Sequence, residues 1–194
     1  MALGDSYTIG TSVQARERFP DQLVAALGRE PALRLVANLG VNGYTTDDLI
    51  REELPALDNL EPEFATVLIG VNDVVQAVPL ERYEANAVTI LDALRARLPA
   101  DRIVVVAIPD YTVTPAGADY GDPGHQHDAI VASNAVMERL AGARRIAYVD
   151  IFDISQRAAD DRSLVADDGL HPSGAQYGLW VERIRAVVQR LLGR

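Results

Sequence analysis

Short runs of apolar, mostly β-branched residues alternate along this chain with longer segments in which apolar residues recur every three or four positions. This alternation is typical of a parallel sheet covered by helices, because a helix must return the chain to the same edge before the next parallel strand begins. We therefore expect an α/β fold. Five strands are predicted: Met1–Leu3, Arg34–Asn38, Ala65–Gly70, Ile103–Ile108 and Ile146–Val149.

Two segments show regular helical periodicity, one beginning after Pro79 and one after Ser173. Further helices are predicted over Phe19–Leu27, Thr46–Leu57 and Ala129–Ala141. The Pro- and Gly-containing stretch Pro109–Asp128 is expected to be a long functional loop. No repeat or linker divides the chain, so we expect a single domain over residues 1–194.

Composition narrows the available chemistry. The 194 residues include no Cys, and every one of the 18 basic residues is Arg. Disulfides, thiolate zinc sites and cysteine nucleophiles are thereby excluded, as are lysine Schiff bases and phosphate-loop lysines. The formal charge of −10 and the scattered Arg residues disfavour a nucleic-acid partner. No apolar run reaches the ~20 residues that span a bilayer, so we expect no stable membrane insertion and a cytoplasmic protein.

Polar or Gly-containing segments follow the first three predicted strands, and another precedes the last helix. The carboxyl ends of the strands form the ligand-binding edge of an open α/β sheet, so these segments are expected to meet there. They are Gly4-Asp5-Ser6, Asn38 through Thr45, Gly70-Val71-Asn72-Asp73 and Asp168-Gly169-Leu170-His171.

The residue types in these segments fit acyl transfer. That reaction needs a nucleophile, a base, a group that orients the base, and hydrogen-bond donors for the developing oxyanion. Ser6, His171 and Asp168 can fill the first three roles. The backbone N–H groups of Ser6 and Gly43, with the side-chain amide of Asn72, can fill the fourth.

In their order and spacing the four segments resemble the conserved blocks of the SGNH, or GDSL-type, serine hydrolases, and the resemblance covers nearly the whole chain. It implies a flavodoxin-like three-layer α/β/α sandwich with a central sheet of about five parallel strands. It also implies hydrolysis of acyl esters without a cofactor. The implied roles are nucleophile for Ser6, oxyanion donors for Gly43 and Asn72, and the base with its orienting carboxylate for His171 and Asp168.

The chain departs from the family's pattern at Tyr7, where leucine is usual, and this change is expected to reshape the pocket floor rather than the acyl chemistry. Asp5, Tyr7, Tyr44 and Tyr111 are predicted to contact the substrate. Because Thr8 stands where a second glycine would be needed, Ser6 is not the nucleophile elbow of the α/β-hydrolase fold.

Asp168 and His171 lie three residues apart in a turn, so the carboxylate can reach the near ring nitrogen and leave the other nitrogen facing Ser6. An imidazole has an ordinary pKa of ~6.5, and hydrolysis is expected to fade as His171 becomes protonated. Asp167 is the rival orienting carboxylate, but only Asp168 has the family's spacing.

His125 and His127 form a His-x-His pattern beside Asp128, which could bind a divalent metal. No further ligand set accompanies them, so we expect no metal site and favour a solvated or substrate-lining loop. The expected partner is a small-molecule acyl ester, most simply a soluble short-chain or carbohydrate acetyl ester. The alternatives are a lysophospholipase or acyl thioesterase with a longer groove formed by Pro109–Asp128, and a non-catalytic ligand-binding module on the same fold.

Overall fold

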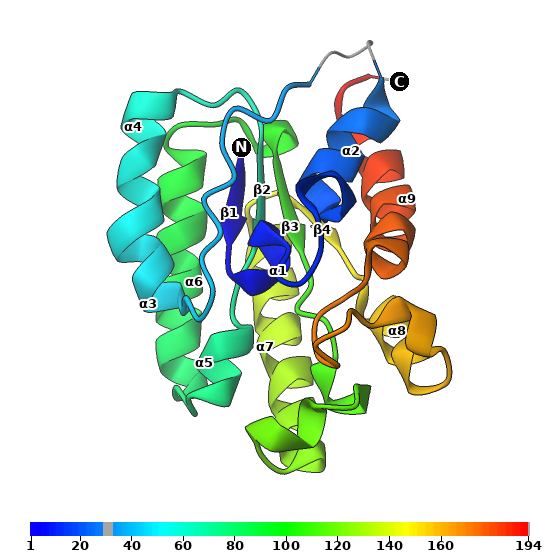
Figure 1. Cartoon of the computed structure of the whole chain (residues 1–194). Coiled ribbons are helices and arrows are strands. Elements are labelled where there is room, and N and C mark those ends of the chain that lie inside the picture. The colour runs from blue at the N-terminus through cyan, green and yellow to red at the C-terminus, as the bar shows by residue number, and fades with distance from the viewer. Residues whose placement is uncertain (29–32, 194) are drawn as a thin grey trace.

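The computed structural model describes residues 1–28 and 33–193, and four parallel strands form its centre (Figure 1). They lie across the sheet in chain order: β1 (Ala2–Gly4), β2 (Ala65–Leu68), β3 (Ile103–Val106) and β4 (Ala147–Val149). The register pairs Leu3 with Val67 and Val67 with Val105. Every residue of β2 and β3 is buried, which explains why neither strand alternates between polar and apolar residues: β3 is wholly apolar, and Thr66 is the one polar residue of β2.

The prediction of a full strand over Arg34–Asn38 is wrong. This segment runs beside β1 but makes only one bridge, in which Asn38 pairs in parallel with Ala2. The N–H of Val41 still donates to the carbonyl of Gly4 at 3.2 Å, but a second bridge does not form because the N–H of Gly4 donates to Oε2 of Glu53 at 2.9 Å instead of to the neighbouring backbone. With this segment outside β1, the order of the sheet is that of flavodoxin-like folds.

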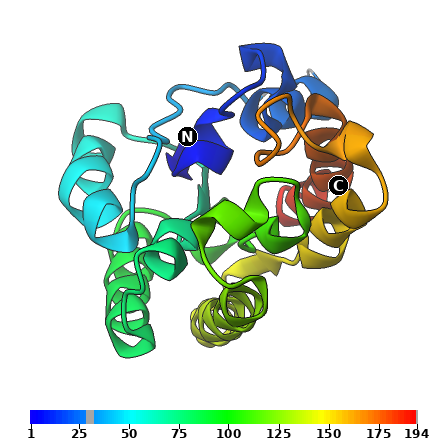
Figure 2. The same ribbon diagram turned by 60° about the horizontal axis from the view of Figure 1, so that its bottom comes forward.

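Helices cover both faces of the sheet, as Figures 1 and 2 show. α2 (Phe19–Leu27) packs against α9 (Gly174–Leu191) on one face. α6 (Leu80–Arg95) packs against α7 (Pro123–Ala143) on the other, beside the helical run of residues 46–60. The predicted three-layer α/β/α fold is therefore confirmed.

The predicted helix over Thr46–Leu57 forms, but it changes geometry along its length. The sequence of elements is α3 (Thr46–Asp48), a π turn (Leu49–Glu53), a 3₁₀ turn (Leu54–Ala56) and α4 (Leu57–Leu60). Pro55 lacks an N–H and its ring crowds the carbonyl four residues earlier, so a regular α-helix cannot pass through it. The N–H of Leu54 accordingly donates to the carbonyl of Leu49, five residues back.

The expected loop Pro109–Asp128 is shorter than predicted. It contains two 3₁₀ turns, over Tyr111–Val113 and Gly117–Tyr120, and α7 then begins at Pro123. The carboxylate of Asp122 accepts a hydrogen bond from the N–H of His125 at 2.8 Å, and a proline is well suited to the first helical position. His125 and His127 therefore lie in the first turns of α7 and not in a loop.

Among the described residues, three short α-helices have no counterpart in the sequence prediction: α1 (Ser6–Ile9), α5 (Val71–Val75) and α8 (Phe152–Gln156). Each has at most five residues, too few for a periodic pattern to be recognised. α1 and α5 begin almost directly after β1 and β2, so they place the residues that follow these strands at the carboxyl edge of the sheet (Figure 2).

An aromatic cluster fixes α1 against α2 and α9. The rings of Tyr177 and Trp180 meet edge to face at 5.0 Å between centroids, and both pack against Phe19. The Tyr177 hydroxyl donates to the carbonyl of Tyr7 at 3.0 Å. This bond joins the last long helix to the turn that carries Ser6.

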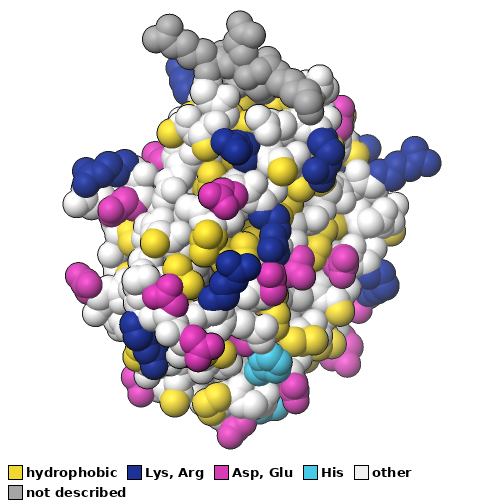
Figure 3. Space-filling model, turned by 90° about the vertical axis from the view of Figure 1, so that its right-hand side faces the viewer, with side chains coloured by type: hydrophobic (Ala, Val, Ile, Leu, Met, Phe, Trp, Pro, Cys, Tyr) yellow, Lys and Arg dark blue, Asp and Glu magenta, His cyan; other side chains and the backbone are white. Residues whose placement is uncertain are grey.

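On the face that bears α8 and α9, basic and acidic side chains are interspersed rather than separated (Figure 3). Arg183 of α9, for example, pairs with Asp153 of α8 at 2.5 Å. Within residues 1–28 and 33–193, no helix combines the length and the apolar character needed to cross a bilayer.

Candidate active site

Ser6 is the first residue of α1 and is 7% exposed. Before it, Gly4 has a φ of 146°, and a Cβ there would lie 2.0 Å from the carbonyl oxygen of Leu68, so the turn from β1 into α1 requires glycine. Asp5 caps the helix by accepting the N–H of Tyr7 at 3.0 Å. The N–H of Ser6 itself has no hydrogen-bond partner among the described residues.

His171 and Asp168 lie on the loop before α9 and contact each other. The Nδ1 atom of His171 is 2.6 Å from Oδ2 of Asp168. The other oxygen, Oδ1, accepts the backbone N–H groups of Leu170 and His171, both at 2.9 Å. The carboxylate that contacts the imidazole is thus the one with the family's spacing, and the Nε2 atom of the ring remains available.

Ser12 is a residue that sequence reasoning missed. Its hydroxyl donates to Oδ2 of Asp168 at 2.5 Å, and its φ of 65° lies in the left-handed region. Partial burial raises the pKa of Asp168, but the hydrogen bonds from Ser12, Leu170 and His171 outweigh it and hold this pKa well below its ordinary value. No sequence motif marks Ser12, because the bond joins positions 156 residues apart.

Asn72 and Gly43 approach the same place from two segments. The side-chain nitrogen of Asn72 donates to the carbonyl of Tyr44 at 2.9 Å, which leaves its second hydrogen free. Gly43 has a φ of 82°, and its N–H has no partner within the part of the chain that the structure describes. The N–H of Gly40, in contrast, donates to the side chain of Asn38 at 3.1 Å.

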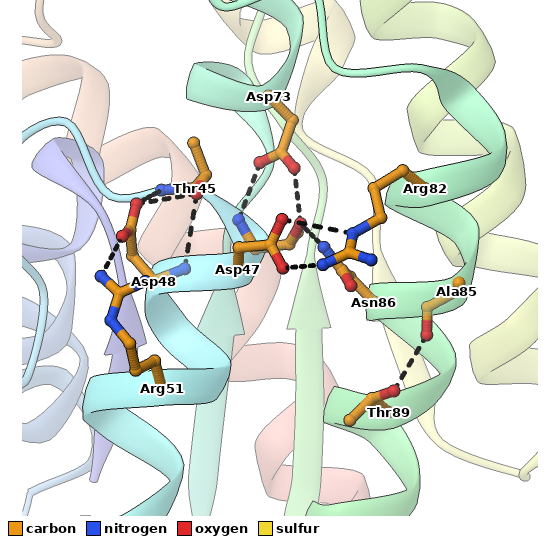
Figure 4. A network of polar contacts seen from close by, with 10 residues as sticks. Thr45, Asp47, Asp48, Arg51, Asp73, Arg82, Ala85, Asn86 and Thr89 are labelled. Atoms are coloured by element: carbon orange, nitrogen blue, oxygen red, sulfur yellow. Dashed lines mark hydrogen bonds and ion pairs between the residues drawn. The ribbon is translucent and has the colours of Figure 1, made fainter.

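A polar network holds the helix of Asn72 in place (Figure 4). The carboxylate of Asp73 accepts the N–H of Thr46 at 2.9 Å and also its hydroxyl. Asn86 of α6 donates to the same hydroxyl at 2.9 Å. Because this network joins α3, α5 and α6, it fixes Asn72 relative to the segment that carries Gly43.

Two buried carboxyl groups lie beneath the site. Burial raises the pKa of both Asp5 and Glu53 to about 8. One oxygen of each, Oδ2 of Asp5 and Oε1 of Glu53, has no hydrogen-bond partner among the described residues. Burial therefore favours the protonated form of both groups.

Ser6, Gly43, Asn72 and His171 line one cavity of about 230 Å³. The other lining residues are Tyr7, Asn42, Val71, Val75, Tyr111, Tyr120 and Leu170. The Tyr7 ring lies 5.6 Å from the His171 ring, measured between centroids.

Of the predicted substrate-contacting residues, the structure thus places Tyr7 and Tyr111 in the cavity wall. Asp5 is completely buried, and Tyr44 contributes a carbonyl that orients Asn72, so neither lines the cavity. The apolar wall residues Val71, Val75 and Leu170 were missed, although the first and last lie inside the polar motifs.

His127 does not face a second histidine ligand. Its Nδ1 atom lies 2.8 Å from the buried carboxylate of Asp110. Within residues 1–28 and 33–193, no three His, Asp or Glu side chains are grouped so that they could hold a metal ion.

A parallel α/β/α sandwich with a serine, a His–Asp pair and amide donors at its carboxyl edge has the architecture of an esterase of the serine hydrolase class. The chain belongs to the GDSL-like lipase/acylhydrolase family, whose sequence model matches residues 2–179. The resemblance seen in the sequence is confirmed, and the chain is a carboxylic ester hydrolase. Among curated proteins, none matches it.

Solved structures share the fold at low sequence identity. The esterase EstA from Pseudoalteromonas sp. is 17% identical with a TM-score of 0.74, covering 100% of this chain and 97% of its own. TesA is 19% identical with a TM-score of 0.74, covering 98% and 97%. The acetylxylan esterase Axe2 from Geobacillus stearothermophilus is 19% identical with a TM-score of 0.74, covering 100% and 93%.

Proposed function

We propose that this chain is a serine esterase that forms an acyl-enzyme on Ser6, with His171 as general base and Asp168 as its orienting carboxylate. The observation that carries the proposal is that Ser6 and His171 line one cavity, while Nδ1 of His171 lies 2.6 Å from Asp168. This contact holds the imidazole with Nε2 available to the serine. The low pKa of Asp168 keeps the carboxylate charged when the ring becomes an imidazolium.

In the first half of the reaction, the Ser6 hydroxyl attacks the ester carbonyl and gives its proton to Nε2 of His171. The tetrahedral intermediate then expels the alcohol, which takes the proton back from His171, and an acyl ester remains on Ser6. In the second half, His171 removes a proton from water, whose oxygen attacks the acyl carbon. The acid leaves as Ser6 regains its proton.

The oxyanion of each tetrahedral intermediate is bound by three donors. These are the backbone N–H groups of Ser6 and Gly43 and the second N–H of the Asn72 side chain. The two backbone groups are unpartnered within the described residues, and Tyr44 holds the Asn72 amide in position, so the donors are arranged before substrate binds.

The substrate is a short-chain or carbohydrate acetyl ester. A volume of about 230 Å³ lies below the range of roughly 300–1,000 Å³ typical of sites for drug-sized ligands, so it suits a small acyl group. We propose that Tyr7 and Tyr111 contact this group. The likeness to an acetylxylan esterase supports the same substrate class.

Because buried residues from Met1 to Val188 share one core cluster, we further propose that residues 1–194 form one domain.

The test is hydrolysis of p-nitrophenyl esters from acetate to palmitate by the native chain, Ser6→Ala and His171→Ala. We expect the native chain to cleave mainly the short esters. Ser6→Ala should lose on the order of 10⁶ in kcat, down to the background of the assay. A fluorophosphonate probe should label Ser6 in the native chain, as mass spectrometry of the labelled peptide would show.

Ser163→Ala is the matched control, because it removes a surface hydroxyl that also donates to an aspartate, Asp161, at 2.6 Å. It should leave hydrolysis unchanged. Full activity in folded Ser6→Ala would overturn the mechanism. A maximum at long acyl chains would instead favour the lysophospholipase or thioesterase alternative, and a folded native chain that cleaves no ester would favour the binding module.

A further inference from the structure

A second cavity of about 370 Å³ lies on the other side of α5 from the candidate active site. It is lined by α5, the beginning of α6 and the first turns of α7, and it is open to solvent where Ala77 and Leu80 are exposed. Its wall is largely apolar and includes Val74, Ala77, Val78, Leu80, Ala129 and Ala132. The hydroxyl of Tyr83, which also lines it, is buried and has no hydrogen-bond partner among the described residues. The fold thus contains an apolar space larger than the catalytic cavity and adjacent to it.

Beside α5, which separates much of the two cavities, one pair of side chains joins their walls. Tyr111 lines the catalytic cavity and Gln126 lines the second one. The Tyr111 hydroxyl donates to Oε1 of Gln126 at 2.7 Å, and the two residues are only 3% and 9% exposed. The side-chain nitrogen of Gln126 donates to the carbonyl of Tyr120 at 3.2 Å. Both side chains are therefore held where the walls of the two cavities meet, and we call them the Tyr111–Gln126 partition.

The turn that carries Tyr111 is held rigidly. The buried carboxylate of Asp110 accepts the N–H of Thr112 at 3.1 Å and its hydroxyl at 2.6 Å. The other oxygen of Asp110 contacts Nδ1 of His127 on α7. Because Asp110 is tied to the same helix as Gln126, the tyrosine ring cannot easily leave the partition.

We propose that the Tyr111–Gln126 pair sets the acyl-chain limit of the active site by closing it off from the second cavity. The inference rests on the proposed esterase function and names the residues that restrict its substrate. In the native chain, the end of a longer acyl group meets the Tyr111 ring. Without that ring, the alkyl chain can continue into the second cavity. Each methylene that moves from water into an apolar space strengthens binding about fourfold.

The experiment measures kcat/KM for p-nitrophenyl acetate, butyrate, hexanoate, octanoate and decanoate with the native chain, Tyr111→Ala and Tyr111→Phe. We expect Tyr111→Ala to shift the preferred ester to a longer chain, with kcat/KM rising by about fourfold per added methylene beyond the native limit. Tyr111→Phe loses the hydrogen bond to Gln126 but keeps the ring, so it should retain the native limit. Tyr111→Leu, a milder change for folding, should shift the limit in the same direction by less.

A second substitution shows where the longer chain goes. Ala132 lines the second cavity, and Ala132→Phe fills it from α7. The double variant Tyr111→Ala/Ala132→Phe should therefore return to the native chain-length limit. If it keeps the longer preference, the chain does not enter the second cavity and the inference is wrong.

The inference is also overturned if folded Tyr111→Ala and Tyr111→Leu remain active on p-nitrophenyl acetate and keep the chain-length preference of the native chain over the ester series. Failure of the proposed function is a different result: the native chain would cleave no ester and Ser6 would not react with the fluorophosphonate. An active native chain with an unchanged preference in the variants refutes the role of the partition alone.

Discussion

Replacing Ser12 with alanine removes one of the four hydrogen bonds that Asp168 accepts from the described residues. The lost bond and the contact with Nδ1 of His171 share the same carboxylate oxygen, Oδ2. Without the Ser12 hydroxyl, the carboxylate of Asp168 can rotate so that Oδ2 moves away from the imidazole or binds water. The ring of His171 is then held less firmly toward Ser6.

The magnitude follows from the surroundings of Asp168. A hydrogen bond to a charged group contributes about 1.5–3 kcal/mol. The side chain of Asp168 is 30% exposed, so water can partly replace the lost hydroxyl, and the lower end of this range applies. A loss of about 1.5 kcal/mol in the transition state lowers kcat/KM about tenfold. Asp168→Asn, which removes the charge itself, should cost about 10⁴.

The assay is kcat/KM for p-nitrophenyl acetate, with Ser163→Ala as the surface control. Ser12→Gly separates the hydroxyl from the backbone, because glycine adopts the φ of 65° without strain. If the hydroxyl matters, Ser12→Gly and Ser12→Ala lose activity alike. Native activity in both folded variants would refute the reasoning, and so would a loss as large as that of Asp168→Asn.

Three further predictions concern the oxyanion donor, a buried carboxyl and a tight glycine. Asn72→Ala should lower kcat for p-nitrophenyl acetate by about 10²–10³, and a loss below tenfold would contradict its role as a donor. The folded pKa of Glu53, about 8, lies above its ordinary value of 4.5, so its stabilising effect is complete below about pH 4.5 and lost as the pH rises through 8. Glu53→Gln should therefore gain stability over the native chain as the pH rises from about 4.5 to about 8 in urea unfolding, and a constant difference over that range would contradict this. Gly70→Ala should reduce the free energy of unfolding by about 1–3 kcal/mol, because φ is 123° and the new Cβ would lie 2.6 Å from the Tyr83 ring; an unchanged urea midpoint would show that the turn adapts.

The sequence was most informative where the signal is local. The central strands β2 and β3 are visible as largely apolar runs, and α6 and α9 as periodic segments, because burial dictates these patterns. The start of α7 also has a local signal, because Asp122 followed by Pro123 is typical of a helix N-terminus. The motif residues Ser6 and His171 come together in one cavity because the ends of parallel strands share an edge.

The rest depended on residues far apart in the chain. The strand expected over Arg34–Asn38 is reduced to one bridge because Glu53 takes the N–H of Gly4, 49 residues away. The sequence around Ser12 does not predict its hydrogen bond to Asp168. The Tyr111–Gln126 partition likewise exists only after a turn and a helix have packed together. Such features belong to tertiary structure and leave no periodic trace in the sequence.

The bond from the Tyr177 hydroxyl to the carbonyl of Tyr7 spans 170 residues, and the contact between Ser12 and Asp168 spans 156. Closing loops of this size is entropically costly, and contacts between distant positions tend to form late in folding. Strands and helices can therefore assemble before Ser6 has a base. During refolding, ester hydrolysis should recover after the far-ultraviolet circular dichroism signal. Recovery of activity would then report when the N-terminal segment that carries Ser6 packs against the C-terminal segment that carries His171.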